Sequence, residues 1–363
     1  MLFKWLLKRA IWYLIYPFCT RYLMRTLLLI LLLAMLTFSS SHAATIDLYR
    51  GEAVVESKDA SARGRALPEA LKHVLQKFSG LRSFEDYPQV EPALRQASSI
   101  LMSFYYRNVN IVLADGSEVE ELRLVAQFSS EKVDEMVRSL ELPLWPAERD
   151  PMDIWVVVDN GLDRRIMPLE FAYVWESMTD TAAWRGLPVN WPQADEEGMF
   201  EVDAQLLWGG YTEDLGLAPG RGAMIAAARR EGQEWSVRTN IAYSGDNWTW
   251  RNQDLDLQSA LTASLQQAVD LIAAANAIAA SDLGIWKHDV TVDGVHSAAA
   301  YESCLAYLQR LSIVNQVSVV SAQSGRIMFR IELNALPQYF EEALADGGVF
   351  EREEDESFYF FRP

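Results

Sequence analysis

The chain has 363 residues, of which 50 are Asp or Glu and 32 are Lys or Arg, so its formal net charge at pH 7 is −18. Such a charge repels nucleic acid phosphates and anionic lipid headgroups, which argues against both as main partners. Half of the residues are hydrophobic, and the chain is longer than one core usually serves, so we expect a folded protein of two or three packed units.

The first 44 residues have the pattern of a cleavable secretion signal. Arg25 precedes an apolar run at residues 26–38, and small residues follow that run, which is the order of a basic start, an apolar stretch and a peptidase site. The spacing predicts cleavage after Ala43, with cleavage after Ala44 as the alternative. Translation from Met24 is a second alternative, because charged residues interrupt the apolar character of the segment before it.

We therefore expect the protein in the periplasm, outside a bacterial inner membrane. An anchor in that membrane through an uncleaved signal is the alternative, although the apolar run is shorter than the ~20 residues that a spanning helix needs. Cleavage leaves Cys304 as the only cysteine, which excludes an internal disulfide and a multi-thiolate metal site. Its apolar helical neighbours predict a buried thiol.

Hydrophobic periodicity divides the rest of the chain into three units of mixed helix and strand. In the N-terminal α/β unit (45–146) we expect strands at 47–56, 105–113 and 121–128 and helices at 66–78, after Pro92, and at 131–140. Proline inside the first helical pattern predicts either a helix start or a kink at Pro68. The segment Leu142–Pro146 has the composition of a linker.

The central, Trp-rich α/β unit (147–283) begins with a continuous apolar strand at 154–158, which is typical of a strand covered on both faces. A helix at about 169–184, a hairpin of strands at 223–229 and 234–243, a strand at Trp248–Trp250 and a helix at about 257–279 follow. The C-terminal unit (284–363) has the order β-α-β-β-α-β of the ferredoxin-like arrangement. The expected class is therefore α/β (α+β), with two mixed α/β sandwich units followed by a ferredoxin-like unit.

Several short segments also resemble a known family. They are the helical pattern at 62–75, Phe78-Ser79-Gly80, the strand 122–128, Leu142-Pro143-Leu144-Trp145-Pro146, residues 155–159 and Arg185-Gly186-Leu187-Pro188. Together they resemble an uncharacterised family of secreted bacterial proteins, domain of unknown function 2066. The resemblance implies secretion and an α/β architecture, and it supplies no activity, substrate or catalytic residue.

The sequence contains few groups that indicate catalysis or metal binding. No nucleophile elbow or phosphate loop occurs, and His288 and His296 have only Asp289 and Asp293 at metal-ligand spacing, whereas zinc sites usually show tighter ligand sets. We therefore expect no cofactor, no metal and no enzymatic activity. A hydrolase that uses two carboxylates is a weak alternative, because with fifty acidic residues some pair always lies close in space.

Tryptophan is the residue type most suggestive of binding, because nine tryptophans fall between residues 145 and 250. Trp248 and Trp250 are one residue apart, which predicts that both lie on the same face of a strand, and Arg238 and Arg251 are expected to frame that face. The leading hypothesis is a non-catalytic binding or scaffolding protein that engages another, unidentified envelope protein. The alternative is a glycan or peptidoglycan binder that uses the Trp248 and Trp250 face.

Overall fold

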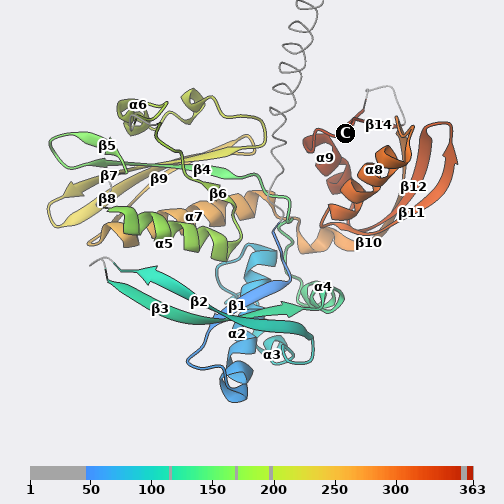
Figure 1. Ribbon diagram of the computed structural model, residues 1–363, viewed down its shortest axis with the longest axis horizontal. Coiled ribbons are helices and arrows are strands. Elements are labelled where there is room, and N and C mark those ends of the chain that lie inside the picture. The colour runs from blue at the N-terminus through green and yellow to red at the C-terminus, as the bar shows by residue number, and fades with distance from the viewer. Residues whose placement is uncertain (1–45, 114–116, 168–170, 196–198, 353–357, 363) are drawn as a thin grey trace, which may run out of the picture. The chain divides into compact units, whose positions relative to one another are not determined.

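The computed structural model describes residues 46–113, 117–167, 171–195, 199–352 and 358–362. The expected secretion signal lies outside these residues, together with Met24 and both candidate cleavage residues, Ala43 and Ala44. The described part is a mixed α/β protein with eight α-helices and three open β-sheets (Figure 1), which confirms the expected class. No helix in this part is both long and apolar enough to span a membrane.

The first sheet is antiparallel and has the strand order β1-β3-β2. Its elements are β1 (Arg50–Val54), α2 (Ala60–Ser79), α3 (Val90–Leu94), β2 (Leu101–Val112), β3 (Glu118–Phe128) and α4 (Ser130–Ser139). Helix α2 packs closely on β1 and β3, so that a Cβ atom at Gly51 would lie 1.9 Å from the carbonyl oxygen of Ala70. The close approach of helix to sheet therefore requires glycine at position 51.

Helix α2 starts at Ala60 rather than at Pro68, and Pro68 lies inside it. The carboxylate of Asp59 accepts hydrogen bonds from the backbone N–H groups of Ser61 (2.9 Å) and Ala62 (2.8 Å), so it caps the start of the helix. Proline is tolerated because the residue four positions earlier, Gly64, is exposed, and water can solvate the carbonyl that Pro68 leaves without a donor.

The central sheet has the strand order β5-β4-β7-β8-β9, with β6 also paired to β4. Its elements are β4 (Met152–Asp159), β5 (Arg164–Ile166), α5 (Ala172–Arg185), β6 (Val189–Asn190), α6 (Ala204–Gly209), the 3₁₀ helix η2 (Thr212–Leu215), β7 (Gly222–Glu231), β8 (Glu234–Tyr243), β9 (Asp246–Asp254) and α7 (Leu257–Asn276). Helices α5 and α7 cover one face and α6 lies on the other (Figure 1). Residues 154–159 are all buried, as the apolar run at 154–158 predicts for a strand covered on both faces.

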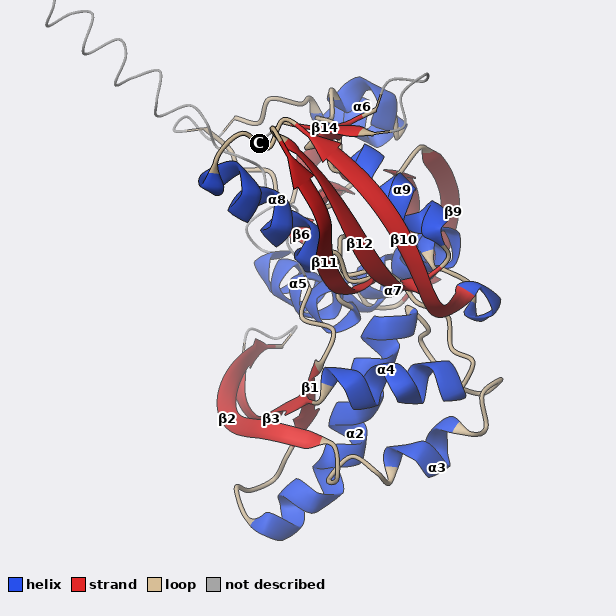
Figure 2. Cartoon of the chain, turned by 90° about the vertical axis from the view of Figure 1, so that its right-hand side faces the viewer, coloured by secondary structure: helices blue, strands red, loops and turns tan. Residues whose placement is uncertain are grey.

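The third sheet has the strand order β11-β12-β10-β14-β13. Its elements are the 3₁₀ helix η3 (Ala280–Asp282), β10 (Leu283–Asp293), α8 (Ala298–Arg310), β11 (Val314–Gln323), β12 (Arg326–Ala335), α9 (Pro337–Asp346), β13 (Phe350–Glu351) and β14 (Tyr359–Phe361) (Figure 2). The order of helices and strands up to α9 is the predicted one. However, β14 runs parallel to β10, whereas the ferredoxin-like arrangement predicts an antiparallel last strand. The additional strand β13 reverses the chain once more before β14 and so changes its direction.

The predicted linker at Leu142–Pro146 is not a free connection. Leu142, Leu144 and Trp145 are buried, and Leu144 forms a two-residue bridge with Ile278, with N–H to O=C distances of 2.9 and 2.7 Å. Apolar side chains from the first and third sheets belong to one continuous buried cluster here. The segment is therefore part of the protein core, because its apolar side chains are removed from water.

Two buried arginines join the ends of α2 and α5. Each helix ends at a glycine with left-handed φ, Gly80 and Gly186, which leaves carbonyl groups without helical partners. Arg149 donates to the carbonyls of Lys77 (2.6 Å) and Gly186 (2.7 Å), and Arg185 donates to that of Gly80 (2.7 Å). The two cations thereby satisfy orphan carbonyls at the negative ends of both helices.

Candidate functional site

Trp248 and Trp250 lie on the same face of β9, as their spacing predicts. In the register with β8, Trp248 is opposite Ile241 and Trp250 is opposite Thr239. This face of the sheet packs against α7, and both indoles are half-buried against the apolar cluster there. The indole Nε1 of Trp250 is buried and has no hydrogen-bond partner among the described residues. The two tryptophans therefore act largely as packing residues.

Arg238 and Arg251 lie directly opposite each other on β8 and β9. They occupy the face of the sheet that α6 covers in part, which is opposite to the face of Trp248 and Trp250. The expectation that these arginines frame the tryptophan pair is therefore wrong. The physical reason is that neighbouring positions on a strand alternate between faces, and pairing partners share a face.

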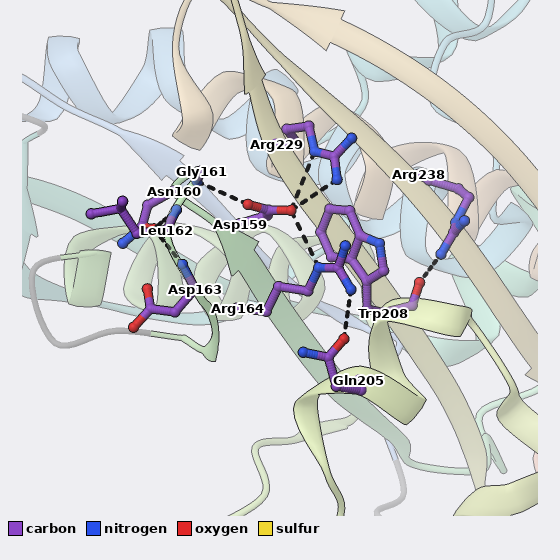
Figure 3. Close-up of polar contacts among 10 residues, drawn as sticks. All are labelled: Asp159, Asn160, Gly161, Leu162, Asp163, Arg164, Gln205, Trp208, Arg229 and Arg238. Atoms are coloured by element: carbon purple, nitrogen blue, oxygen red, sulfur yellow. Dashed lines mark hydrogen bonds and ion pairs between the residues drawn. The ribbon is translucent and has the colours of Figure 1, made fainter.

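A cluster of charged residues lies on the α6 face at the end of β4 (Figure 3). In the sheet register, Asp159 of β4 is flanked by Arg164 of β5 and Arg229 of β7. The Asp159 Oδ2 atom accepts from Arg229 Nη2 (2.9 Å) and from Arg164 Nε (3.2 Å), and its Oδ1 atom accepts from the Gly161 N–H (2.9 Å). The hydrogen bond from Arg229 is the largest of several causes that lower the pKa of Asp159, so this carboxylate stays ionised at neutral pH.

The indole of Trp208, from α6, lies between the two guanidinium groups (Figure 3). The Cζ atoms of Arg164 and Arg229 are 4.6 and 5.0 Å from the indole ring centroid, which is the distance range of cation–π contacts. Arg164 also donates to Gln205 Oε1 (2.5 Å), and Arg238 donates to the Trp208 carbonyl. Helix α6 is thus attached to the sheet by arginine contacts.

The position of the cluster agrees with the general location of ligand sites in sheets with parallel strands. Asp159 is the last residue of β4, and Arg229 lies near the end of β7, which is parallel to β4. The connections on the two sides of β4 carry α5 on one face and α6 on the other. Side chains at the carboxyl ends of parallel strands next to such a change of face commonly bind ligands.

The charge of this face differs from that of the whole protein. Residues that pair across neighbouring strands form rows over the sheet. One row contains Arg164, Asp159 and Arg229, and the next row on the same face contains Arg238 and Arg251. Asp159 is thus the acidic residue among these arginines. Arg229 keeps 44% of its side chain exposed although it is paired, and Arg251 is exposed. Guanidinium groups bind carboxylates and phosphates through paired hydrogen bonds. The arrangement is therefore suited to an anionic ligand, and we call it the arginine face.

A shallow pocket of about 780 Å³ adjoins the arginine face. Residues from the segment after α6 and from β8 and β9 line it, among them Tyr211, Asn240, Trp248 and Thr249. Asn240 donates to Thr249 Oγ1 (2.9 Å), but its Oδ1 atom is buried and lacks a partner among the described residues. The pocket therefore offers the exposed ring of Tyr211 as an aromatic surface.

Metal binding and cysteine chemistry have less structural support than anion binding at the arginine face. No group of three or more His, Cys, Asp or Glu side chains in the described part of the chain is placed to hold a metal ion. Cys304 is buried, as predicted, and burial raises the pKa of its thiol to about 12. The thiolate that a nucleophile or metal ligand needs is therefore scarce at neutral pH.

Sequence reasoning missed Asp159, Arg164, Trp208 and Arg229 as a cluster. An acidic residue directly after the buried strand at 154–158 was the available signal, because acids at the carboxyl ends of buried parallel strands commonly bind ligands. The position of Arg229 next to it follows only from the parallel pairing of β4 with β7, which no local pattern reveals.

One part of the chain matches a known protein-family model. Residues 43–146 match the model of a domain of unknown function (DUF8605). No curated protein matches the chain. A solved structure titled "Crystal structure of uncharacterized protein" is 9% identical, covers 35% of this chain and 88% of its own, and has a TM-score of 0.15.

The family match overturns the resemblance to domain of unknown function 2066. That resemblance depended on the spacing of apolar residues and on a few short sequence motifs spread along the chain. Such features are common to many α/β domains, so they discriminate poorly between families. The model that matches residues 43–146 is instead that of the domain of unknown function DUF8605.

Proposed function

We propose that this protein is a periplasmic, non-catalytic binding or scaffolding protein that engages another envelope component through the arginine face. The observation that carries the proposal is the alignment of Arg229, Arg238 and Arg251 on one face of the central sheet, in a chain whose net charge is −18. A local positive surface on an acidic protein attracts an acidic partner and orients it during encounter.

The contacts of these arginines favour a preorganised surface. The Arg229 and Arg164 guanidiniums are held by Asp159 and by the indole of Trp208, so little side-chain entropy is lost when a partner binds. Arg251 has no ion-pair partner among the described residues and presents its full charge. An acidic segment of a partner protein fits this combination of fixed and free guanidiniums.

A glycan or peptidoglycan ligand is the second candidate, and the pocket beside the arginine face favours it. Tyr211 lines the pocket and is 52% exposed, so its ring supplies a flat apolar surface that suits a sugar ring. Glu213 is the one carboxylate in the pocket lining. The two-carboxylate hydrolase alternative therefore gains no support from this pocket.

The finer domain arrangement is part of this proposal. We propose that residues 45–146, 147–283 and 284–363 form two α/β sandwich units and a variant of the ferredoxin-like unit, since each contributes one of the three sheets. Hydrogen exchange in increasing urea, resolved by mass spectrometry, tests the boundaries, because the segment at 142–146 is buried and closed to proteases. Protection lost together within each of the three ranges supports the boundaries, and protection lost in a single step across all three contradicts them.

In-cell crosslinking tests the proposed partner surface. A photo-crosslinking residue at Gln253, an exposed position of β9 on the arginine face, is expected to capture an envelope protein, and Arg251→Glu is expected to abolish the capture through charge repulsion. Arg95→Glu makes the same charge change at an exposed site on another part of the protein and is expected to leave capture unchanged.

Three results would count against the proposal: no captured protein, capture that survives Arg251→Glu, or a tagged protein that fractionates with the cytosol. N-terminal sequencing of the purified protein distinguishes a start at Ala44 or Thr45 from an uncleaved, membrane-anchored chain. Quenching of tryptophan fluorescence by peptidoglycan fragments, lost in Tyr211→Ala, would instead support the glycan candidate.

A further inference from the structure

The turn between β4 and β5 contains Asn160-Gly161, the one Asn-Gly sequence in the chain (Figure 3). Both residues are exposed, so water reaches the turn. The side-chain amide of an asparagine lies close to the backbone nitrogen of the following residue, and attack by that nitrogen on the amide carbon is an intramolecular reaction that closes a succinimide ring. Glycine hinders this attack least, because it has no Cβ atom.

The backbone of the turn is open at Gly161. Its φ is 90°, in the region that favours glycine. Apart from the two chain neighbours, no atom lies within 4 Å of the position that a Cβ atom would occupy. The next side chain, that of Leu162, is 95% exposed. The conformation of the turn, and not close packing, therefore requires glycine here, and no other element closes over that side of the residue.

The side-chain carbonyl of Asn160 is held by two backbone donors. Its Oδ1 atom accepts from the N–H groups of Leu162 (2.9 Å) and Asp163 (3.1 Å) (Figure 3). Attack on Cγ would place negative charge on this oxygen. Donors that are already aimed at an oxygen where charge develops stabilise the transition state without reorganisation, as in an oxyanion hole. The turn therefore activates the amide carbon of Asn160.

The attacking nitrogen has a proton acceptor. The Gly161 N–H donates to Asp159 Oδ1 (2.9 Å), and the other carboxylate oxygen is held by Arg229 and Arg164. This hydrogen bond points at the proton that must leave the nitrogen, and a carboxylate at such a distance is placed to act as general base. Asp159 and the two donors thus act on opposite partners of one reaction.

We propose that Asn160 is a self-modification site, which converts to aspartate or isoaspartate with Asp159 as the base. The Gly161 nitrogen bonds to Asn160 Cγ and gives its proton to Asp159. The Cγ–Nδ2 bond breaks, and the leaving nitrogen takes up that proton and departs as ammonia. Water then opens the succinimide at either of its two carbonyls, and the net change is the exchange of an amide for an acid.

The products change the charged cluster at the end of β4. Either product adds a carboxylate next to Asp159 and Arg164, and isoaspartate also lengthens the main chain by one carbon between β4 and β5. Because Arg164 contacts the indole of Trp208 and Gln205, the change reaches the attachment of α6. A lower affinity of the arginine face for an acidic partner would follow, and this last consequence alone rests on the proposed function.

Peptide mapping by mass spectrometry tests the proposal on purified protein kept at neutral and at mildly alkaline pH. Acid and isoacid are expected at position 160, while Asn315, which is exposed and precedes Gln316, is expected to remain an amide. The native protein is expected to react at least as fast as a free peptide of residues 153–166, in which neither Asp159 nor the two donors are held. Gly161→Ala is expected to suppress the reaction.

Two variants separate the role of Asp159 from a general effect of charge. Asp159→Asn is expected to slow the reaction at least about tenfold through loss of the base. Asp163→Asn makes the same change in the same turn and keeps its backbone N–H, so its rate is expected to match the wild type, with circular dichroism confirming that both variants are folded. An unmodified Asn160, a free peptide that reacts faster than the native protein, or equal rates in the two variants would overturn the proposal. None of these measurements involves a partner, so their outcome is independent of the crosslinking experiment.

Discussion

The stability of the protein is expected to fall in mildly acidic solution because of one buried histidine. His73 is 4% exposed, and its ring stacks on Trp184 with 3.8 Å between centroids. Its Nδ1 atom accepts from the Glu52 N–H (2.9 Å), and its Nε2 atom lies 2.7 Å from the Trp184 carbonyl, to which it donates. A second ring proton would therefore point at the N–H of Glu52. Burial, followed by the nearby charge of Lys77, lowers the pKa of His73 to about 3.

The direction of the pH effect on stability follows from the different pKa of His73 in the folded and unfolded protein. An unfolded histidine has a pKa of about 6.5 and takes up a proton below that pH, whereas the folded protein does not until about pH 3. The contribution of His73 to the free energy of unfolding is therefore fully present above pH 6.5 and is lost as the pH falls toward 3. One proton corresponds to about 1.4 kcal/mol per pH unit, so His73 removes about 3 kcal/mol between pH 7.5 and pH 4.5.

Urea unfolding of the wild type and His73→Gln, followed by tryptophan fluorescence from pH 7.5 to pH 4.5, measures this loss. Glutamine keeps one donor and one acceptor but does not titrate in this range. The free energy of unfolding of the variant is expected to fall by about 3 kcal/mol less than that of the wild type. Equal pH dependence in both proteins, or a His73 ring resonance that titrates near pH 6.5, would refute the reasoning.

Two further predictions concern packing. Arg149→Met removes hydrogen bonds to the carbonyls of Lys77 and Gly186 and is expected to lower the free energy of unfolding by about 3–5 kcal/mol, since the buried carbonyls lose charged donors. Arg251→Met, at an exposed arginine, should change it by less than about 0.5 kcal/mol, and equal effects of the two variants in urea unfolding would contradict the assignment. Gly51→Ala is expected to destabilise the protein by about 3 kcal/mol or more through overlap with α2. Gly64→Ala, with open space at its Cβ position, should stabilise it by about 0.5–1 kcal/mol in the same assay, and the reverse order of the two glycine variants would disprove the packing argument.

Local patterns in the sequence were sufficient to predict that most helices and strands exist and which of the two each one is. The run at 154–158 predicted a buried strand, the apolar spacing from Ala66 to Phe78 predicted α2, and the spacing of Trp248 and Trp250 placed both on one face. These results share a cause, because side-chain direction along a strand or helix depends on the backbone period alone. The same reasoning located the hairpins of β7 with β8 and β11 with β12.

Tertiary structure decided which face of each element meets solvent and which strands become neighbours. The face of Trp248 and Trp250 is covered by α7, the arginines lie on the other face, and the parallel pairing of β4 with β7 brings Arg229 to Asp159. The direction of β14 depends on the two residues of β13. Such features arise from contacts between residues distant in the chain, whose formation depends on the total burial of apolar surface rather than on local periodicity.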